Sequence, residues 1–354
     1  MFDVGHMNFF SIDFCGLYKV GNKKTFGCEV EETFDLILDW AKPRPLTSTI
    51  PWDPGSAKRN RPKCYCQDIY KDEVTGDFFL VLWKSDTDSA GTLWGAPEDD
   101  KTGTGSVVKY TSQYQGRKKV VWGRPCYYWV VPRLNLVVSV KFDHSVCDAQ
   151  LFEDYIVSCM NNRVKHPNRK KDYTDQGFVR ISYVGSEDVR YQYRFRMSLK
   201  SLNTSSVELR NLVKNITHIV SRETILVDSK DERSEWVKKF TEYVPFVAAK
   251  PKSKTRKIEV KAEAKPTVSE IHEIIEKNAT EGRKPSDWDN VGFMTEKGIT
   301  WVDRYRLRDH ITIHGEKDDF MTAESLCRNI MKERDKLLAP VNREALEKNI
   351  LEEA

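Results

Sequence analysis

The run from Arg190 to Met197 constrains the fold of this chain more than any other stretch. It reads Arg-Tyr-Gln-Tyr-Arg-Phe-Arg-Met, so polar or charged residues alternate with large apolar ones. Because successive side chains of a β-strand point to opposite faces, this period of two predicts a strand with one buried face. The aromatic residues and Met197 would pack on a core. The other face would carry Arg190, Gln192, Arg194 and Arg196.

Two interpretations of this arginine row stay open. Cations two residues apart on one strand face repel one another unless anions lie nearby, and a polyanion such as nucleic acid would supply those anions. Alternatively, the row is the solvated outer face of an antiparallel sheet, which often carries arginine and lysine. The sequence pattern of the strand alone does not separate a binding surface from an ordinary exposed one.

The composition predicts a globular protein with about two domains. A chain of 354 residues suggests this number because domains average about 150 residues. No apolar run approaches the ~20 residues needed to cross a bilayer. The eight cysteines follow neither a repeat nor a zinc-ligand spacing. We therefore expect a cytoplasmic protein with reduced thiols, no metal site and no cofactor.

Positive charge is segregated along the chain. The net charge is only +4, yet residues 163–200 hold ten Lys and Arg against four Asp and Glu, and residues 250–261 hold six against one. The remainder of the chain is therefore net acidic. This segregation predicts a basic surface rather than a generally basic protein.

Hydrophobic periodicity predicts an α+β fold with a mainly antiparallel sheet and packed helices. The segments expected as strands are 8–20, 64–70, 77–84, 120–122, 127–131, 136–142, 177–184, 189–200, 223–227, 291–295, 298–305 and 309–314. The segments expected as helices are 32–40, 148–161, 207–220, 232–243, 268–278 and a long helix that begins near Thr322.

The segment 250–266 is the clearest candidate linker. It is rich in charge, poor in large apolar residues and bracketed by Pro251 and Pro266. We therefore expect an α+β core domain at 8–249 and a smaller hairpin-plus-helix region at 267–354. The first seven residues are expected to lie outside the fold.

A second cluster of cations directly precedes the hairpin that carries the arginine row. Pro167 and Asn168 predict that this cluster lies in a loop. If loop and strand face the same way, their cations converge on one surface that binds phosphates rather than bases, because no helix-turn-helix, zinc-finger or RNA-recognition signature is present. The candidate nucleic-acid contacts are Arg163, Lys165, Arg169, Lys170, Lys171, Arg190, Arg194 and Arg196.

The segment from His144 to Ala149 offers an enzymatic alternative. It is similar to the His-x-x-x-Asp-Gly motif of the chloramphenicol acetyltransferase and condensation-domain family. That resemblance implies His144 as a general base and Asp148 as a structural residue. Asp143 and Ala149 depart from the residues common in the family. In the other interpretation, Asp148 or Ser145 simply caps the helix that follows.

Three stretches resemble the phage exclusion protein RexA and related phage-defence proteins. They are residues 75–86, a strand and turn; 138–156, a strand leading to a helix with an acidic residue; and 292–338, a hairpin leading to a terminal helix. The resemblance lies in the order of elements and in scattered residues, and this chain is longer. It implies a dimeric, cytoplasmic, DNA-binding sensor that triggers a membrane effector protein. We therefore expect a non-enzymatic nucleic-acid-binding protein of phage exclusion.

Overall fold

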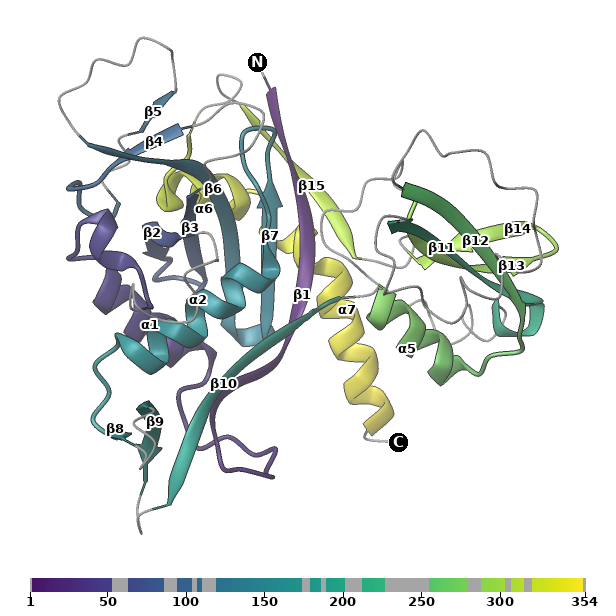
Figure 1. Ribbon diagram of the computed structural model, residues 1–354, viewed down its shortest axis with the longest axis horizontal. Coiled ribbons are helices and arrows are strands. Elements are labelled where there is room, and N and C mark those ends of the chain that lie inside the picture. The colour runs from purple at the N-terminus through teal and green to yellow at the C-terminus, as the bar shows by residue number, and fades with distance from the viewer. Residues whose placement is uncertain are drawn as a thin grey trace. The chain divides into compact units, whose positions relative to one another are not determined.

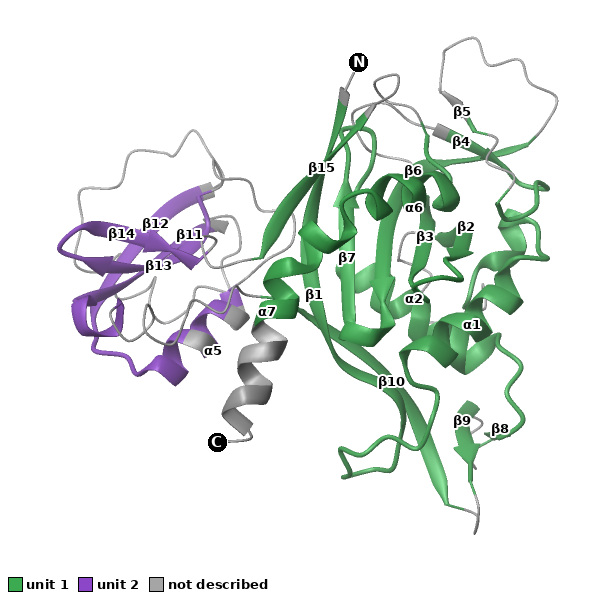
Figure 2. Cartoon of the chain, turned by 180° about the vertical axis from the view of Figure 1, so that it is seen from behind, with its two compact units in different colours: residues 1–200, 307–354 green, residues 201–306 purple. Residues whose placement is uncertain are grey.

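The computed structural model contains two compact units, residues 1–200 together with 307–354, and residues 201–306 (Figure 2). Their antiparallel sheets and packed helices confirm the predicted α+β class. The structure describes residues 2–52, 63–85, 94–103, 107–109, 119–173, 179–185, 189–200, 212–226, 255–278, 288–302, 307–314 and 320–352.

The first unit is built on an eleven-stranded sheet with antiparallel neighbours (Figure 1). Its main path runs β2-β3-β6-β7-β1-β10-β9-β8, while β15 also pairs with β1 and β4 pairs with β5 and β6. The strands are β1 (Phe2–Tyr18), β2 (Cys64–Lys71), β3 (Phe78–Ser85), β4 (Trp94–Pro97), β5 (Val108–Lys109), β6 (Val120–Val131), β7 (Leu136–Lys141), β8 (Arg169–Tyr173), β9 (Val179–Val184), β10 (Arg190–Leu199) and β15 (Arg308–His314).

The long strand β1 corrects two expectations about domain boundaries. Its first residues pair with β15 from Phe2 to Asn8, so the start of the chain belongs to the sheet. Its later residues, from Phe10 to Tyr18, pair with β10. The chain therefore returns to the first unit after residue 306 instead of forming a separate region at 267–354. Periodicity shows that a segment is a strand but not which distant strand it pairs with, so this return was not predicted.

Helices cover both faces of the central strands. The residues of β3 alternate between two cores: Phe78, Leu80 and Leu82 pack with helices α1 and α2, whereas Phe79 and Val81 pack with α6 and α7. Strands buried on both faces read as continuous apolar runs, as this one does. The helices are α1 (Val30–Ala41), α2 (Ala149–Asn162), α6 (Ala323–Met331) and α7 (Arg334–Glu352), with 3₁₀ turns η1 (Leu46–Thr49) and η3 (Pro132–Leu134).

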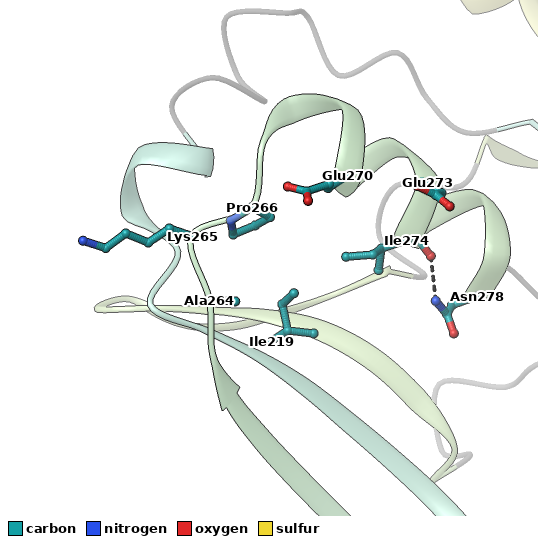
Figure 3. A pocket seen from close by; sticks show the side chains of 8 residues that line it. All are labelled: Ile219, Ala264, Lys265, Pro266, Glu270, Glu273, Ile274 and Asn278. Carbon is teal, nitrogen blue, oxygen red and sulfur yellow. Dashed lines mark hydrogen bonds between the residues drawn. The ribbon is translucent and has the colours of Figure 1, made fainter.

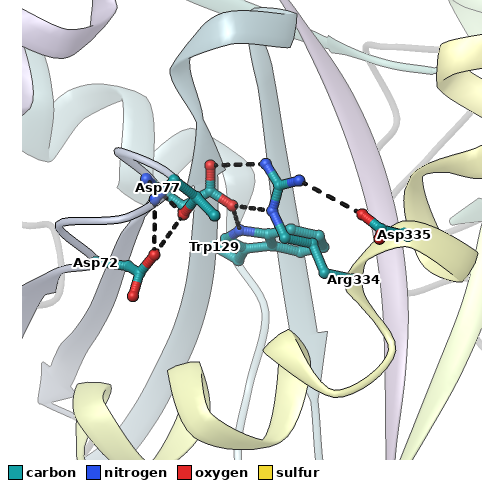
Figure 4. A network of polar contacts seen from close by, with 6 residues as sticks. Asp72, Asp77, Trp129, Arg334 and Asp335 are labelled. Atoms are coloured by element: carbon teal, nitrogen blue, oxygen red, sulfur yellow. Dashed lines mark hydrogen bonds and ion pairs between the residues drawn. The ribbon is translucent and has the colours of Figure 1, made fainter.

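A buried ion pair fixes the start of α7 to the β2–β3 hairpin (Figure 4). Arg334 holds the Asp77 carboxylate with two contacts, Nε–Oδ2 at 2.7 Å and Nη2–Oδ1 at 3.1 Å. The indole of Trp129 donates a third hydrogen bond to Oδ2 at 2.9 Å. The Asp77 side chain is fully buried and the Arg334 side chain is 19% exposed. This bidentate geometry joins segments that are far apart in sequence.

Two side chains satisfy amides at the start of α6. The hydroxyl of Thr322, the N-cap, accepts from the amide of Ser325, which confirms the helix start predicted at Thr322. The single long helix expected to begin there is instead two helices, α6 and α7, separated by a turn. The carboxylate of Asp68 accepts from the amide of Ala323 at 2.7 Å. Asp68 follows a register shift in the β2–β3 pairing and is buried. An acid on strand β2 thus anchors a helix from the end of the chain.

Asp68 gives the stability of the protein a defined pH dependence. Burial raises the pKa of its carboxyl above the ordinary 3.8, with the Ala323 amide opposing the shift. A raised pKa means that folding favours the protonated form, so this contribution is greatest below pH ~4 and is lost as pH rises through the raised pKa. We expect the stability of the wild type, relative to Asp68→Asn, to fall as pH rises from ~4 to ~7. Urea unfolding of both proteins across this range measures it, and parallel pH profiles would contradict it.

The second unit is a four-stranded antiparallel sheet with helix α5 (Val268–Asn278). Ile271 and Ile275, one helical turn apart, pack with Phe293 in its small core. The strand order is β12-β11-β13-β14, with β11 (His218–Leu226), β12 (Thr255–Glu263), β13 (Asn290–Thr295) and β14 (Gly298–Trp301).

The segment predicted as a linker is largely strand β12, which pairs with β11 from Thr255 to Glu263. Charged residues alternate here with Ile258 and Val260, and an edge strand of a sheet tolerates this high content of charge. A linker has a similar composition, so composition alone did not distinguish the two. The helix expected at 207–220 ends earlier than predicted: residues 212–215 are helical, β11 begins at His218, and residues 207–211 lie outside the described part of the chain. The helix expected at 232–243 lies outside the described residues. Within the described part of the chain, no helix is both long and apolar enough to cross a membrane.

Candidate nucleic-acid interface

Strand β10 has the two-faced character that its sequence predicts. Tyr193, Phe195 and Met197 are buried and pack in the core beneath α1 and α2. The intervening residues from Arg190 to Arg196 are exposed. The tyrosine and phenylalanine rings supply the burial that holds the strand in register, and the guanidinium groups are consequently directed to the opposite side of the sheet. The alternation predicted from the sequence is confirmed.

The neighbouring strands add cations to the same face. In the β8–β9–β10 register, Arg190 lies opposite Val184, Ser182 opposite Lys170, and Arg180 opposite Asp172. Arg190 Nη1 contacts Asp172 Oδ2 at 2.8 Å across β9, which places both residues on one face. We use the name arginine face for this side of the three strands. Its cations are Lys170, Arg180, Arg190, Arg194 and Arg196.

Acids lie near two cations of the arginine face, Arg190 and Arg196. The Arg190–Asp172 pair is half-exposed on both sides, and exposed pairs contribute about 0.2 to 1 kcal/mol. Arg194 lies over the ring of Tyr18, 5.9 Å from its centroid. Burial raises the pKa of the Asp13 carboxyl, against a hydrogen bond from Ser198 and the charge of Arg196. Arg196 therefore has two acids nearby, Asp13 and Glu153, and its charge favours the ionised form of each.

Two of the predicted contact residues serve the fold instead. Arg163 follows α2, and its guanidinium donates to the carbonyls of Ile50 and Trp52, both at 3.2 Å. Arg169 donates to the carbonyl of Asn161 at 3.2 Å. These hydrogen bonds satisfy main-chain acceptors around the end of α2. The structure thus directs Arg163 and Arg169 toward the protein, away from the arginine face.

The predicted lysines divide between two sides of the β8–β9 hairpin. Lys170 lies on the arginine face, whereas Lys171 is one residue further and faces the other side. Lys171 is exposed and lies 5.8 Å from the ring centroid of Tyr173, which is itself 70% exposed. Lys165 is exposed in the loop before β8. Within the described residues, none of these lysines has a carboxylate at ion-pair distance. Part of the expected loop is strand, because β8 begins at Arg169.

The geometry around His144 does not suit a general base. Its side chain is fully buried, stacks on Phe142, and has Nε2 3.1 Å from the Tyr127 hydroxyl and Nδ1 3.6 Å from an Asp3 oxygen. A base must reach the proton that it removes, and this ring is sealed inside the core. Asp148 caps α2 by accepting from the amide of Leu151, and it also pairs with Lys84 at 2.8 Å. The motif therefore fits the helix-capping interpretation.

The second unit has a pocket of about 420 Å³ between the start of β11 and α5 (Figure 3). One of its two acidic side chains stabilises the start of α5, because the Glu270 carboxylate accepts hydrogen bonds from the amide and hydroxyl of Thr267. We assign no function to this pocket. Its lining residues are Ile219, Ala264, Lys265, Pro266, Glu270, Glu273, Ile274 and Asn278.

Comparisons of this chain with protein-family models, curated proteins and solved structures find no match.

Arg180 is the member of the arginine face that sequence reasoning missed. It lies in the predicted strand 177–184, and its period-two relation to Ser182 and Val184 placed it on one face of that strand. The register across β9 was needed to show that this face is shared with Arg190.

Proposed function

We propose that this protein binds nucleic acid through the phosphate backbone, with the arginine face as the contact surface. One observation supports the proposal most: strands β8, β9 and β10 direct five cations to one face, and within the described residues of these three strands only Asp172 adds a carboxylate to it. Asp13 and Glu153, which lie near Arg196, come from β1 and α2. Each arginine can offer two parallel N–H donors to a phosphate, which a lysine cannot. The spacing of the row is set by the strand, so the cations are positioned before the ligand arrives.

Phosphate is a better partner for this face than the acids already present. The Asp172 carboxylate neutralises only Arg190, through one exposed contact. A polyanion would contact several guanidinium groups at once and release its condensed counterions as it bound. Lys165 and Lys171 lie outside the arginine face but in the same region of the chain. They would extend the positive electrostatic potential that attracts the ligand.

The surface favours phosphate contact over base readout. The cations lie on the face of a strand, and no described element carries a recognised base-reading motif. We therefore expect little sequence preference.

The wider biological setting in this proposal comes from the sequence resemblance to phage exclusion proteins. In that setting the protein would be a homodimeric sensor of abortive infection that binds DNA and triggers a membrane effector protein. We also propose a cytoplasmic location, which suits the eight cysteines, since all are thiols rather than disulfides. Expression of the chain with and without its gene neighbours, followed by phage plating, tests this setting separately from binding.

Salt dependence tests the proposal on the wild-type protein. Each phosphate contact contributes about 0.7 to 0.9 to the slope of log affinity against log salt. With four or more contacts, we expect a slope of at least about 3, or an affinity loss of about 60-fold between about 50 mM and about 200 mM salt. Fluorescence anisotropy with labelled single-stranded and duplex DNA and RNA measures it. Absence of binding at the lower salt concentration, to every one of these ligands, would refute the proposal.

A further inference from the structure

Three potential metal ligands from separate segments meet beside α1. Cys28 lies in the loop after β1, Glu32 in the first turn of α1, and His166 in the loop between α2 and β8. One ligand atom from each, the thiol sulfur, a carboxylate oxygen and an imidazole nitrogen, all lie within 4.8 Å of one another. Residues brought together from three segments by the fold are arranged more specifically than neighbours in sequence.

The backbone at Cys28 is held in an unusual conformation. Its φ is +53°, in the left-handed region that side chains other than glycine seldom adopt. The Cys28 amide donates to Glu32 Oε2 at 2.7 Å, and its carbonyl accepts from the Thr33 hydroxyl at 2.7 Å. These two hydrogen bonds stabilise the conformation that directs the thiol toward Glu32 and His166. Strained residues of this kind are enriched at functional sites.

His166 is also fixed in place. Its ring packs edge-on against Tyr183, and its side chain is only 10% exposed. The Nε2 atom lies 3.9 Å from Glu32 Oε1, so it points into the cluster. The Glu32 side chain is 54% exposed, and while its Oε2 atom accepts from the Cys28 amide, its Oε1 atom faces His166.

We propose that Cys28, Glu32 and His166 bind a zinc ion. Thiolate, imidazole and carboxylate are all ligands that zinc accepts in tetrahedral sites, and three protein ligands leave a fourth position for water. The thiolate and the carboxylate together balance the two positive charges of the ion, so the site is neutral overall and suits partial burial.

Zinc binding requires the three ligand atoms to move closer together. It also requires the Cys28 thiol to lose its proton and the His166 ring to carry its proton on Nδ1. Ligand atoms around tetrahedral zinc lie about 3.3 to 3.6 Å apart. The three ligand atoms lie within 4.8 Å of one another, so the widest separation must close by at most about 1.5 Å. The Cys28 thiol releases its proton to solvent as the Zn–S bond forms. His166 Nδ1 accepts from the Asn168 amide at 3.2 Å. Coordination through Nε2 leaves the ring proton on Nδ1, and this hydrogen bond is lost.

The ion would fasten the loop before β8 to the start of α1. This loop carries Lys165 and leads into β8, which holds Lys170 on the arginine face. The zinc site does not depend on the proposed nucleic-acid binding, because its ligands are distinct from the cations. Sequence spacing hid the site, since His166 is far in sequence from Cys28 and Glu32 and the three match no zinc motif.

Cobalt substitution tests the site on the full chain. Tetrahedral Co²⁺ with a thiolate ligand gives a sulfur-to-metal charge-transfer band in the near ultraviolet and strong d–d bands in the visible. We expect one equivalent of Co²⁺ to produce both in the protein treated with EDTA and dialysed, and Zn²⁺ to abolish them. Cys28→Ser should eliminate the charge-transfer band, whereas Cys147→Ser, a change at the cysteine that is not buried, should retain it.

A second variant guards against misfolding of Cys28→Ser. His166→Gln should unfold at the temperature of the wild type in EDTA, and bind Zn²⁺ more than about tenfold more weakly by competition with a chromogenic chelator. The proposal is overturned if the wild type gives no charge-transfer band, if the band persists in Cys28→Ser, or if His166→Gln binds Zn²⁺ as tightly as the wild type.

Discussion

Replacement of Arg190, Arg194 and Arg196 together by glutamine should weaken nucleic-acid binding about 100-fold and leave the fold intact. All three side chains are exposed on the outer face of β10, and the residues that hold this strand to the core are untouched. Charged hydrogen bonds at an exposed surface contribute about 1 kcal/mol each, so three lost contacts cost about 3 kcal/mol. A factor of ten in affinity corresponds to about 1.4 kcal/mol. Anisotropy titration at low salt measures the change.

The matched control removes the same charge elsewhere on the first unit. Arg328 on α6, Lys332 in the turn after it and Lys336 on α7 are exposed, and their replacement by glutamine changes the net charge equally. This control variant should bind within about twofold of the wild type. An equal loss of affinity in both triple variants would mean that net charge, rather than the arginine face, governs binding.

Among the substitutions proposed here, disruption of the Asp77–Arg334 ion pair should cause the largest loss of stability. In Arg334→Met the Asp77 carboxylate stays fully buried and keeps the hydrogen bond from the neutral Trp129 indole, but it loses the cation that balances its charge. Removal of one partner from a buried pair costs about 3 to 5 kcal/mol, and the partial exposure of Arg334 favours the lower value. For a unit of this size, about 3 kcal/mol corresponds to about 6 to 12 °C in Tm. Differential scanning calorimetry measures the shift.

Two further variants separate the buried charge from the loss of an arginine. Arg328→Met changes an arginine whose side chain is 70% exposed, and it should alter stability by less than about 0.5 kcal/mol. The double variant Asp77→Asn with Arg334→Met removes both charges and should recover part of the loss. If the Tm values of Arg334→Met and Arg328→Met differed by less than about 2 °C, the Asp77–Arg334 ion pair would not hold α7 in place.

Local patterns predicted the elements of this fold well. The alternation in β10, the apolar runs of β2 and β3, and the apolar side of α5 each follow from side-chain periodicity within one segment. The capping role of Asp148 is likewise a local signal, and the structure bears out that interpretation of the His144 segment. Such features are decided by residues close in sequence.

Features that depend on distant segments were not predictable from the sequence. The pairing of β15 with the start of β1 returns the end of the chain to the first unit, and no periodicity reports a partner. Charge density made β12 resemble a linker, although an edge strand tolerates the same residues. Arg163 and Arg169 were counted as surface cations because the carbonyls that they bind belong to the loop after η1 and to α2.

The candidate sites also differ in how much of each could be predicted from local sequence patterns. Most of the arginine face was visible in the sequence because it lies largely on one strand. The membership of Arg180 needed the register across β9, and the cluster of Cys28, Glu32 and His166 needed the packing of α1 against the loop before β8.

The slope of log affinity against log salt, compared between the wild type and the Arg190, Arg194 and Arg196 triple variant, tests the central claim most directly. Each lost phosphate contact removes about 0.7 to 0.9 from the slope, so three lost contacts should reduce it by about 2 to 3. The α6–α7 control variant should keep the wild-type slope. A triple variant whose slope equals that of the wild type would show that these three arginines do not contact phosphates.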